Sequence, residues 1–385
     1  MLMRQQLSAE DIQSRTINLL RFPMAFMVVL IHQDSNFLPS RSCATDYAYD
    51  IIVSAMHQWS GIAVPLFFMI SGYLFFNKVE EFTASVYWEK CRRRIASLVV
   101  PYLCWNALEF LVTLLVILSM VLLLGKPDAM FSDYLRSFNW RMFWECSSSP
   151  GHGRCFGFLP PANNTFPIDI PLWFLRNLIV LSALTPVLHF CLKRFGRLFL
   201  ALLAAAYLSN TWFDCDVLRI SGIFFFSLGA YMSLGGRTMY ECFAPWKNVA
   251  IVAAVLLAVV VVVLHVSGHR PLMEAVMPFY VLAGVVAVVA CTHEAMRDGR
   301  LRSGSKVLAQ SSFFVFALHT IWVNHLTGVA TSKVVGIILS FSPALSRVVT
   351  ILLSPVLVTT VCVLLFVLMR KFTPSLLGWL TGGRR

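Results

Sequence analysis

Long apolar stretches separated by short polar segments recur along the whole chain. A helix needs about 20 apolar residues to cross the hydrocarbon core of a bilayer, and about ten stretches approach or reach that length. We expect helices over residues 16–33, 54–77, 97–124, 171–190, 198–213, 219–235, 248–266, 273–292, 307–326 and 346–369. The pattern predicts an all-α, polytopic helical membrane protein of about ten transmembrane helices in one domain (16–369), with polar tails at 1–15 and 370–385.

Composition and charge support this class and indicate an orientation. Hydrophobic residues make up 58% of the chain and charged residues only 13%, yet the net charge is +12. Lysine and arginine gather after the second, fourth, sixth and eighth predicted helices and in the C-terminal tail. Because basic residues collect on the cytoplasmic side of membrane proteins, we expect both termini in the cytoplasm. No long basic tract is interleaved with aromatic residues, so the charge does not indicate a nucleic-acid partner.

The long loop at 125–170 then faces the extracytoplasmic side. It is rich in serine, proline, glycine and asparagine, which predicts irregular structure. Aromatic side chains in and beside it could either cover a sugar acceptor or form a belt at the membrane interface; they include Trp140, Phe143, Trp144 and Phe156. Cys146 and Cys155 in this loop could form a disulfide in an oxidising compartment.

The first predicted helix carries two residues that are costly in lipid. Arg21 and His32 bracket an apolar run and lie eleven positions apart. At about 100° and about 1.5 Å per residue, they share one helix face and are separated by about 16 Å along the axis. Ionisable residues inside membrane helices usually mark functional sites. The alternative is that each side chain extends to its own headgroup layer.

Further candidates lie in and between the later helices. Ser71 precedes a glycine in the second helix, where small residues serve close helix packing or a polar lining. The arginines before the third helix suit phosphate binding, although topology or anionic lipid explains them equally; they are Arg92, Arg93 and Arg94. Glu109 in the third helix is a candidate buried carboxylate.

Four more candidate residues belong to the fourth and ninth helices. Trp173 and Arg176 lie near the start of the fourth helix, where Arg176 is close enough to its end to reach the interface. The ninth helix holds His319 and His325, which are six positions apart and face different directions. A shared metal ion is therefore not expected, and no other metal-ligand spacing occurs in the chain.

Together these residues resemble the motifs of the acyltransferase-3 family of multi-pass membrane acyltransferases. The similar elements are Arg21-x10-His32, the segment PLFFMISGYL (65–74), Arg92-Arg93-Arg94-Ile95 with Pro101-Tyr102, LWFL (172–175) and Ser312 with His319. Cys91 stands where the family has the first arginine of the third element. The loop at 125–170 matches no family element, so the resemblance does not identify the acceptor.

This resemblance implies transfer of an acyl group, commonly acetyl, from cytoplasmic acyl-CoA to a hydroxyl of a cell-surface or lipid-linked carbohydrate. Arg21 and the arginines 92–94 would hold the phosphates of CoA, and His32 would act as general base or carry the acyl group. Ser71, Trp173 and His319 would contribute to the substrate pocket. The family further implies the inner cell membrane as location, membrane lipid as surroundings, and no tightly bound cofactor.

Two other functions fit the sequence. A proton-coupled transporter or flippase would use Arg21, His32 and Glu109 along its path, and Pro23, Pro65 and Pro278 would break its helices. However, no inverted repeat of hydropathy is apparent. A membrane scaffold without chemistry would tolerate replacement of His32.

Overall fold

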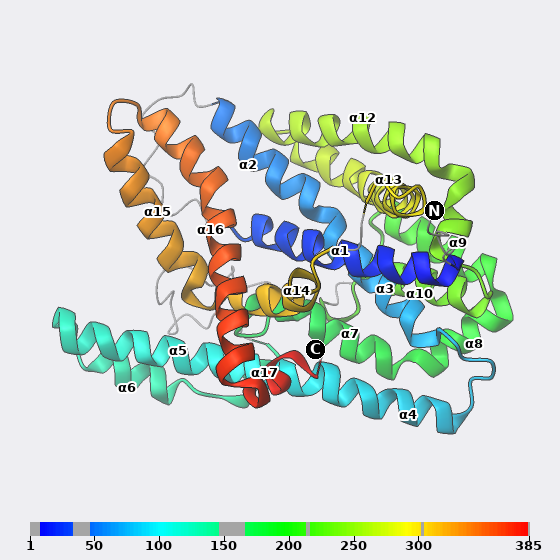
Figure 1. Cartoon of the computed structure of the whole chain (residues 1–385), viewed down its shortest axis with the longest axis horizontal. Helices are drawn as coiled ribbons and strands as arrows, with labels where there is room; N and C mark the ends of the chain where they lie inside the picture. Colours follow the sequence, from blue (N-terminus) through cyan, green and yellow to red (C-terminus); the bar gives the residue numbers. More distant parts are fainter. Residues whose placement is uncertain (1–7, 34–46, 146–165, 213–215, 302–303, 384–385) are drawn as a thin grey trace, which may run out of the picture.

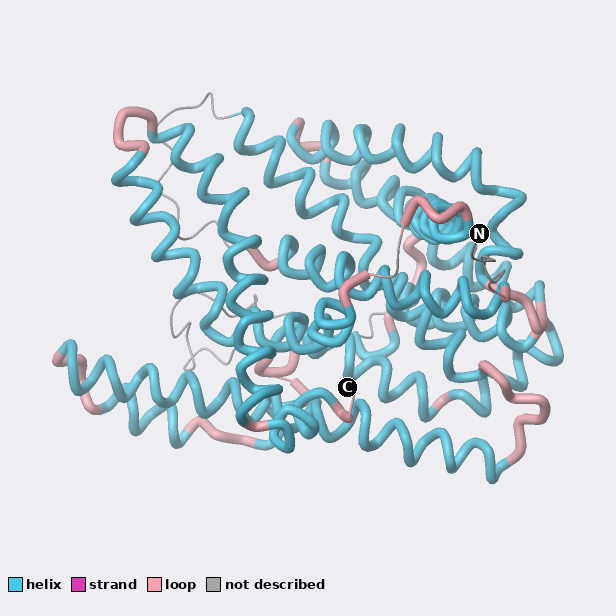
Figure 2. The backbone as a smooth tube through the Cα atoms, in the orientation of Figure 1, coloured by secondary structure: helices cyan, strands magenta, loops and turns pink. Residues whose placement is uncertain are grey.

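The computed structural model describes residues 8–33, 47–145, 166–212, 216–301 and 304–383, and every regular element in these ranges is a helix (Figure 2). The helices of one turn and a half or more are α1 (Ala9–Ile31), α2 (Tyr47–Trp59), α3 (Ala63–Phe76), α4 (Ala84–Arg94), α5 (Val100–Leu124), α6 (Ala129–Arg136), α7 (Trp173–Ala183), α8 (Thr185–Phe195), α9 (Arg197–Leu208), α10 (Ile220–Leu234), α12 (Lys247–Val266), α13 (Arg270–Arg297), α14 (Lys306–Leu318), α15 (Asn324–Ile338), α16 (Pro343–Phe372) and α17 (Pro374–Thr381). A shorter helix, α11 (Met239–Phe243), leads into α12. The chain is therefore all-α, as predicted.

In the described residues, seven helical segments are long and apolar enough to cross a membrane. They are Ala9–Ile31, Ala48–Phe76, Ala84–Leu124, Met239–Val266, Arg270–Arg297, Lys306–Ile338 and Pro343–Phe372. Each matches one of the predicted helices, but the ends differ. α1 begins within the predicted tail, where Ser8 and Asp11 form a capping box.

The other three predicted helices are not single straight helices long enough to cross a membrane. The fourth is the pair α7 and α8, which bends by 63°; Pro186 stands in the first turn of α8. The fifth and sixth correspond to α9 and α10, which have 12 and 15 residues. At about 1.5 Å per residue, both are shorter than the hydrocarbon core of about 30 Å.

The segment before the third predicted helix is helical rather than a loop. α4 continues through a wide turn at Ile95–Val99 into α5, so that 41 residues form one segment from Ala84 to Leu124. Two further segments outside the predicted membrane helices also contain helices. α6 lies within the loop predicted at 125–170, and α17 packs against α5, where the Trp105 indole N–H donates to the Leu380 carbonyl at 2.8 Å. Cys146, Cys155 and Phe156 lie outside the described residues.

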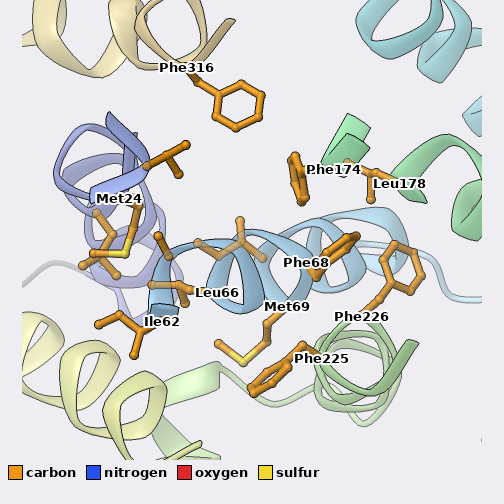
Figure 3. Close-up of a cluster of buried hydrophobic side chains, with 14 of the residues drawn as sticks. Met24, Ile62, Leu66, Phe68, Met69, Phe174, Leu178, Phe225, Phe226 and Phe316 are labelled. Atoms are coloured by element: carbon orange, nitrogen blue, oxygen red, sulfur yellow. The ribbon is translucent and has the colours of Figure 1, made fainter. Parts of the chain in front are cut away.

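The centre of the core is the contact between α3 and α10. Two glycines allow it: a Cβ at Gly72 would overlap the carbonyl oxygen of Phe226, and a Cβ at Gly229 would overlap that of Met69. Figure 3 shows Phe225 and Phe226 directed toward the α3 side chains Phe68 and Met69. Gly72 therefore serves close helix packing.

α1 lies inside the bundle and not at its edge (Figure 1). It packs against α2, α3, α13, α14 and α16. Nine of its residues are buried, including Met24, Val28 and Val29. Because other helices surround α1, Gln13 can be buried with a protein partner: its Oε1 accepts from the Met239 backbone N–H at 2.8 Å.

Candidate active site

A cavity of about 550 Å³ opens between α1, α3, α7, α14 and the turn that joins α4 to α5. Four cationic residues line it: Arg15, Arg21, Arg94 and Lys306. The described wall contains no aspartate or glutamate. A cavity with several cations and no acidic counterpart favours an anionic ligand, and arginines bind phosphate through two parallel hydrogen bonds.

Arg94 is held in place by the second sequence motif. Its Nη2 donates to the Ser71 carbonyl oxygen at 3.2 Å, and its guanidinium carbon lies 5.5 Å from the centre of the Phe75 ring. Ser71 itself lines the cavity. The structure thus brings together Arg21, Ser71 and Arg94, three of the residues predicted from the sequence to bind the donor.

The other part of the cavity wall is aromatic. Phe67, Phe174 and Phe316 line it, and their rings contact one another with centroid distances of 5.9 Å (Phe67–Phe174) and 5.8 Å (Phe174–Phe316). Figure 3 shows Phe174 and Phe316 on facing elements. A wall that is cationic on one part and aromatic on another fits a ligand with a charged head and an apolar arm.

Four residues predicted to bind the donor or the substrate do not line this cavity: Arg92, Arg93, Trp173 and His319, the last of which is described below. Arg92 and Arg93 are exposed on α4, and Arg93 forms an ion pair with Glu89 one turn earlier. Trp173 instead lies under the guanidinium of Arg219, with 4.8 Å from the guanidinium carbon to the ring centre. Its motif contributes to the cavity through the next two residues, Phe174 and Leu175.

His32 and His319 form a pair at the far end of α1. Their ring centroids are 5.1 Å apart and the ring planes meet at 69°. His32 Nδ1 lies 2.8 Å from the Val28 carbonyl oxygen, and His319 Nδ1 lies 2.8 Å from the Phe316 carbonyl oxygen. A carbonyl only accepts hydrogen bonds, so both Nδ1 atoms carry a proton and both Nε2 atoms offer a lone pair.

His319 stands where the helix of the ninth predicted span breaks. Between α14 and α15 the turn at His319–Val323 is non-helical, and Trp322 adopts a positive φ of 59°. Two side-chain hydrogen bonds hold the break: Thr320 Oγ1 donates to Asp169 Oδ1 and Trp322 Nε1 to Thr113 Oγ1, both at 2.9 Å. Strained backbone of this kind persists only where surrounding contacts enforce it, and it is common at functional sites.

Two buried amides connect this break to the end of α1. Asn324 Nδ2 donates to the His32 carbonyl oxygen at 2.6 Å, and Gln33 Nε2 donates to Asn324 Oδ1 at 3.1 Å. These bonds fix the distance between the two helix ends that carry the histidines. We did not predict Gln33, Asn324 or Asp169 as site residues; the signal that was available was a polar residue next to each histidine.

Glu109 and Arg176 have partners other than His32. Glu109 Oε1 accepts a hydrogen bond from Thr113 at 3.2 Å. Glu109 therefore supports the series of hydrogen bonds that runs through Thr113 to Trp322. Arg176 is only 1% exposed, and its Nη1 donates to the Trp144 carbonyl at 2.6 Å. Arg176 therefore does not extend to the membrane interface, which was one interpretation of its position.

The cavity and the histidine pair share two helices. α1 lines the cavity at Arg21 and ends at His32, whereas α14 lines it at Phe316 and ends at His319. About 16 Å of helix separates Arg21 from His32. The candidate anion site and the two imidazoles therefore lie at two different positions along the same pair of helices, α1 and α14.

Comparison with known proteins gives one family and one curated relative. Residues 15–373 match the family described as an acyltransferase domain, of the acyltransferase-3 type. The succinoglycan biosynthesis protein ExoH of Rhizobium meliloti (strain 1021) is 28% identical over 396 residues, which cover 96% of this chain and 92% of that protein. No solved structure matches the chain significantly.

Proposed function

The chain belongs to the acyltransferase-3 family and is a multi-pass membrane O-acyltransferase, and on this premise we propose that it transfers acetyl from cytoplasmic acyl-CoA to a hydroxyl of a surface polysaccharide. The relative named for succinoglycan biosynthesis supports a glycan acceptor. Membership of an enzyme family favours this reaction over a transporter or a scaffold.

The observation that carries the donor assignment is the cavity with four cations. CoA bears a diphosphate and a 3′-phosphate, which Arg15, Arg21, Arg94 and Lys306 would neutralise. The narrow pantetheine arm of CoA would then pass the aromatic wall, where its methyl and methylene groups can pack, and continue along α1 toward His32. A volume of about 550 Å³ lies within the usual range for small-molecule sites.

The proposed orientation places donor and acceptor on opposite sides of the inner cell membrane. The distribution of basic segments favours both termini and the cavity cations on the cytoplasmic side. That orientation requires an even number of crossings: the seven long segments and the bent pair α7–α8 would give eight, and ten would require the shorter α9 and α10 to cross as well. His32 and His319 then lie toward the extracytoplasmic side, where a polysaccharide hydroxyl arrives.

His32 acts as the general base. Its Nε2 lone pair takes the proton of the acceptor hydroxyl while the hydroxyl oxygen attacks the thioester carbonyl carbon; a C–O bond forms, and the C–S bond breaks to release the CoA thiolate. The bond from Nδ1 to the Val28 carbonyl holds the tautomer that this step requires. His319, with an Nε2 that has no partner among the described residues, contacts the acceptor or the acyl group.

The cavity assignment is tested with purified full-length protein in nanodiscs. CoA binding is measured by calorimetry, and transfer is measured with labelled acetyl-CoA and base-deacylated polysaccharide from the source cells. We expect Arg21→Ala and Arg94→Ala each to weaken CoA binding by about tenfold to a hundredfold, the loss of a charged hydrogen bond.

The matched controls are Arg92→Ala and Arg93→Ala, which remove the same charge on the same helix but outside the cavity. Equal losses for Arg93→Ala and Arg94→Ala would show that the basic segment, and not the cavity, binds the donor. A wild-type protein that neither binds CoA nor transfers label would overturn the proposed function.

A further inference from the structure

The helix α17 packs against elements that form the wall of the cationic cavity. It follows residue 373, where the match to the acyltransferase family ends. Leu377, Leu380 and Thr381 of α17 are buried. Its neighbours are α5, α14 and α16 (Figure 1). No described residue of α17 itself lines the cavity, so α17 can affect a bound donor only through the residues that it holds in place.

The wide turn at Ile95–Val99 determines how Arg94 faces the cavity. In this turn the Val100 N–H donates to the carbonyl of Ile95, five residues earlier, instead of the usual four. A turn of this kind adds one residue to a helix and is frequent at functional sites. Relaxation to a regular helix would rotate α4 by about 100° relative to α5. That rotation would carry Arg94 away from the Ser71 carbonyl oxygen, to which its Nη2 donates at 3.2 Å.

α17 contacts the chain both within this turn and after it. After the turn, the fully buried Trp105 donates its indole N–H to the Leu380 carbonyl oxygen at 2.8 Å. Within the turn, a Cβ added at Gly382 would lie 2.6 Å from Ser97 Cα and 2.9 Å from the Ala96 carbonyl oxygen. Only a residue without a side chain allows this approach. Because Ser97 lines the cavity, the end of α17 is in direct contact with a residue of the candidate donor site.

Trp105 connects the same contact to a second part of the cavity wall. Its ring lies edge to face against Phe314 of α14, with 5.3 Å between the ring centroids and 71° between the ring planes. Both neighbours of Phe314 in the aromatic part of α14, Phe313 and Phe316, line the cavity. The tryptophan therefore packs between α17 and the helix that carries the aromatic part of the wall.

We propose that Gly382 and Trp105 are positioning residues for the donor. Through them α17 holds the wide turn in the form that directs Arg94 and Ser97 into the cavity, where the phosphates of CoA bind. This inference rests on the proposed function for the identity of the ligand. Neither Gly382 nor Trp105 lines the cavity, so neither needs to touch the donor.

The experiment compares two neighbouring glycines in purified full-length protein in nanodiscs. Gly382 and Gly383 both have a positive φ, of 62° and 73°, so alanine strains the backbone at either position. Only at Gly382 does the added Cβ meet other atoms, because nothing lies within 4 Å of a Cβ at Gly383. The pair therefore separates pressure on the wide turn from backbone strain.

We expect Gly382→Ala to weaken CoA binding, measured by calorimetry, by about threefold to tenfold, less than the loss of a direct charged contact. The KM for acetyl-CoA should rise by a similar factor, with kcat and the KM for the polysaccharide unchanged. Gly383→Ala should leave CoA binding and all three kinetic constants at their wild-type values.

Trp105→Phe is the second variant, and it supplies the test if Gly382→Ala does not fold. It keeps an aromatic ring beside Phe314 but loses the N–H that bonds to Leu380. We expect the same rise in the KM for acetyl-CoA. Hydrogen-exchange mass spectrometry of residues 94–100 without CoA gives an independent readout. Exchange should be faster in Gly382→Ala and Trp105→Phe than in Gly383→Ala.

Equal CoA affinity in the two glycine variants, or equal exchange at residues 94–100, would overturn the inference. A lower kcat with unchanged CoA affinity would overturn it as well, since α17 would then serve a step other than donor binding. A wild-type protein that binds no CoA would instead refute the proposed function. In that case the exchange measurement would still decide whether α17 holds the turn.

Discussion

The imidazole rings of His32 and His319 meet edge to face at 5.1 Å, although they come from the first and one of the last helices of the chain. Each ring is oriented by a hydrogen bond from Nδ1 to a carbonyl of its own helix, which leaves Nε2 as the nitrogen that a substrate could contact. The contact between the two rings brings together, at one site, two bases that are far apart in the sequence.

Replacing the two histidines should separate their roles. We expect His32→Ala to lower acetyl transfer by about 10²–10⁴-fold, the usual contribution of a general base, with CoA binding unchanged. His319→Ala should lower transfer less. Because the rings are in contact, the double variant should lose less than the product of the two single effects. Fully multiplicative losses in the transfer assay would show that the two histidines act independently.

Asn324 should position the pair through its two hydrogen bonds. Asn324→Ala leaves the His32 carbonyl and the Gln33 amide without this partner, which costs about 1–3 kcal/mol for a buried polar group. We expect a lower melting temperature in detergent, a lower kcat and an unchanged KM for acetyl-CoA. A rise in KM alone would place Asn324 in donor binding.

Gly72 should be essential for folding rather than for chemistry. Gly72→Ala places a Cβ on the Phe226 carbonyl oxygen, which forces α3 and α10 apart. We expect little folded protein on size-exclusion chromatography of detergent extracts. The matched control is Gly336→Ala in α15, where a Cβ meets no atom within 4 Å; it should be neutral or stabilising by up to about 1 kcal/mol.

Asp169, which precedes the first turn of the α7 segment, should make stability depend on pH. Burial raises the pKa of this carboxyl well above its usual range of about 3.9. The folded state therefore holds a proton that the unfolded state releases, and stability falls as pH rises from the ordinary pKa through the raised one. The neutral variant Asp169→Asn should melt higher than the wild type by a margin that grows between acidic and neutral pH. A margin independent of pH would contradict this assignment.

The first helix shows what the sequence could predict. Arg21 and His32 lie on one face as their spacing implied, because helix periodicity depends only on local geometry. The same periodicity explains why only Arg94 among three consecutive arginines reaches the cavity. Successive residues turn by about 100°, so Arg92 and Arg93 leave the helix in other directions than Arg94 does. The polar composition of α4 did not indicate a helix. Helical periodicity could therefore not be applied to its arginines from the sequence.

The break at His319–Val323 could not be predicted from the sequence. The segment HTIWV contains neither glycine nor proline, and its local preference does not oppose a continuous helix. Its conformation is enforced by partners from distant helices, Asp169 and Thr113. The pairing of His319 with His32 depends on those partners, which periodicity alone cannot identify.

The burial of α1 has a consequence for biosynthesis. This helix leaves the ribosome long before α13, α14 and α16, against which it packs. Until they insert, Arg21 and His32 reside in a bilayer or an insertase without their final neighbours. Another protein, such as the insertase, therefore has to contact α1 until the later helices are inserted. A nascent chain truncated before Lys306 should remain bound to the insertion machinery.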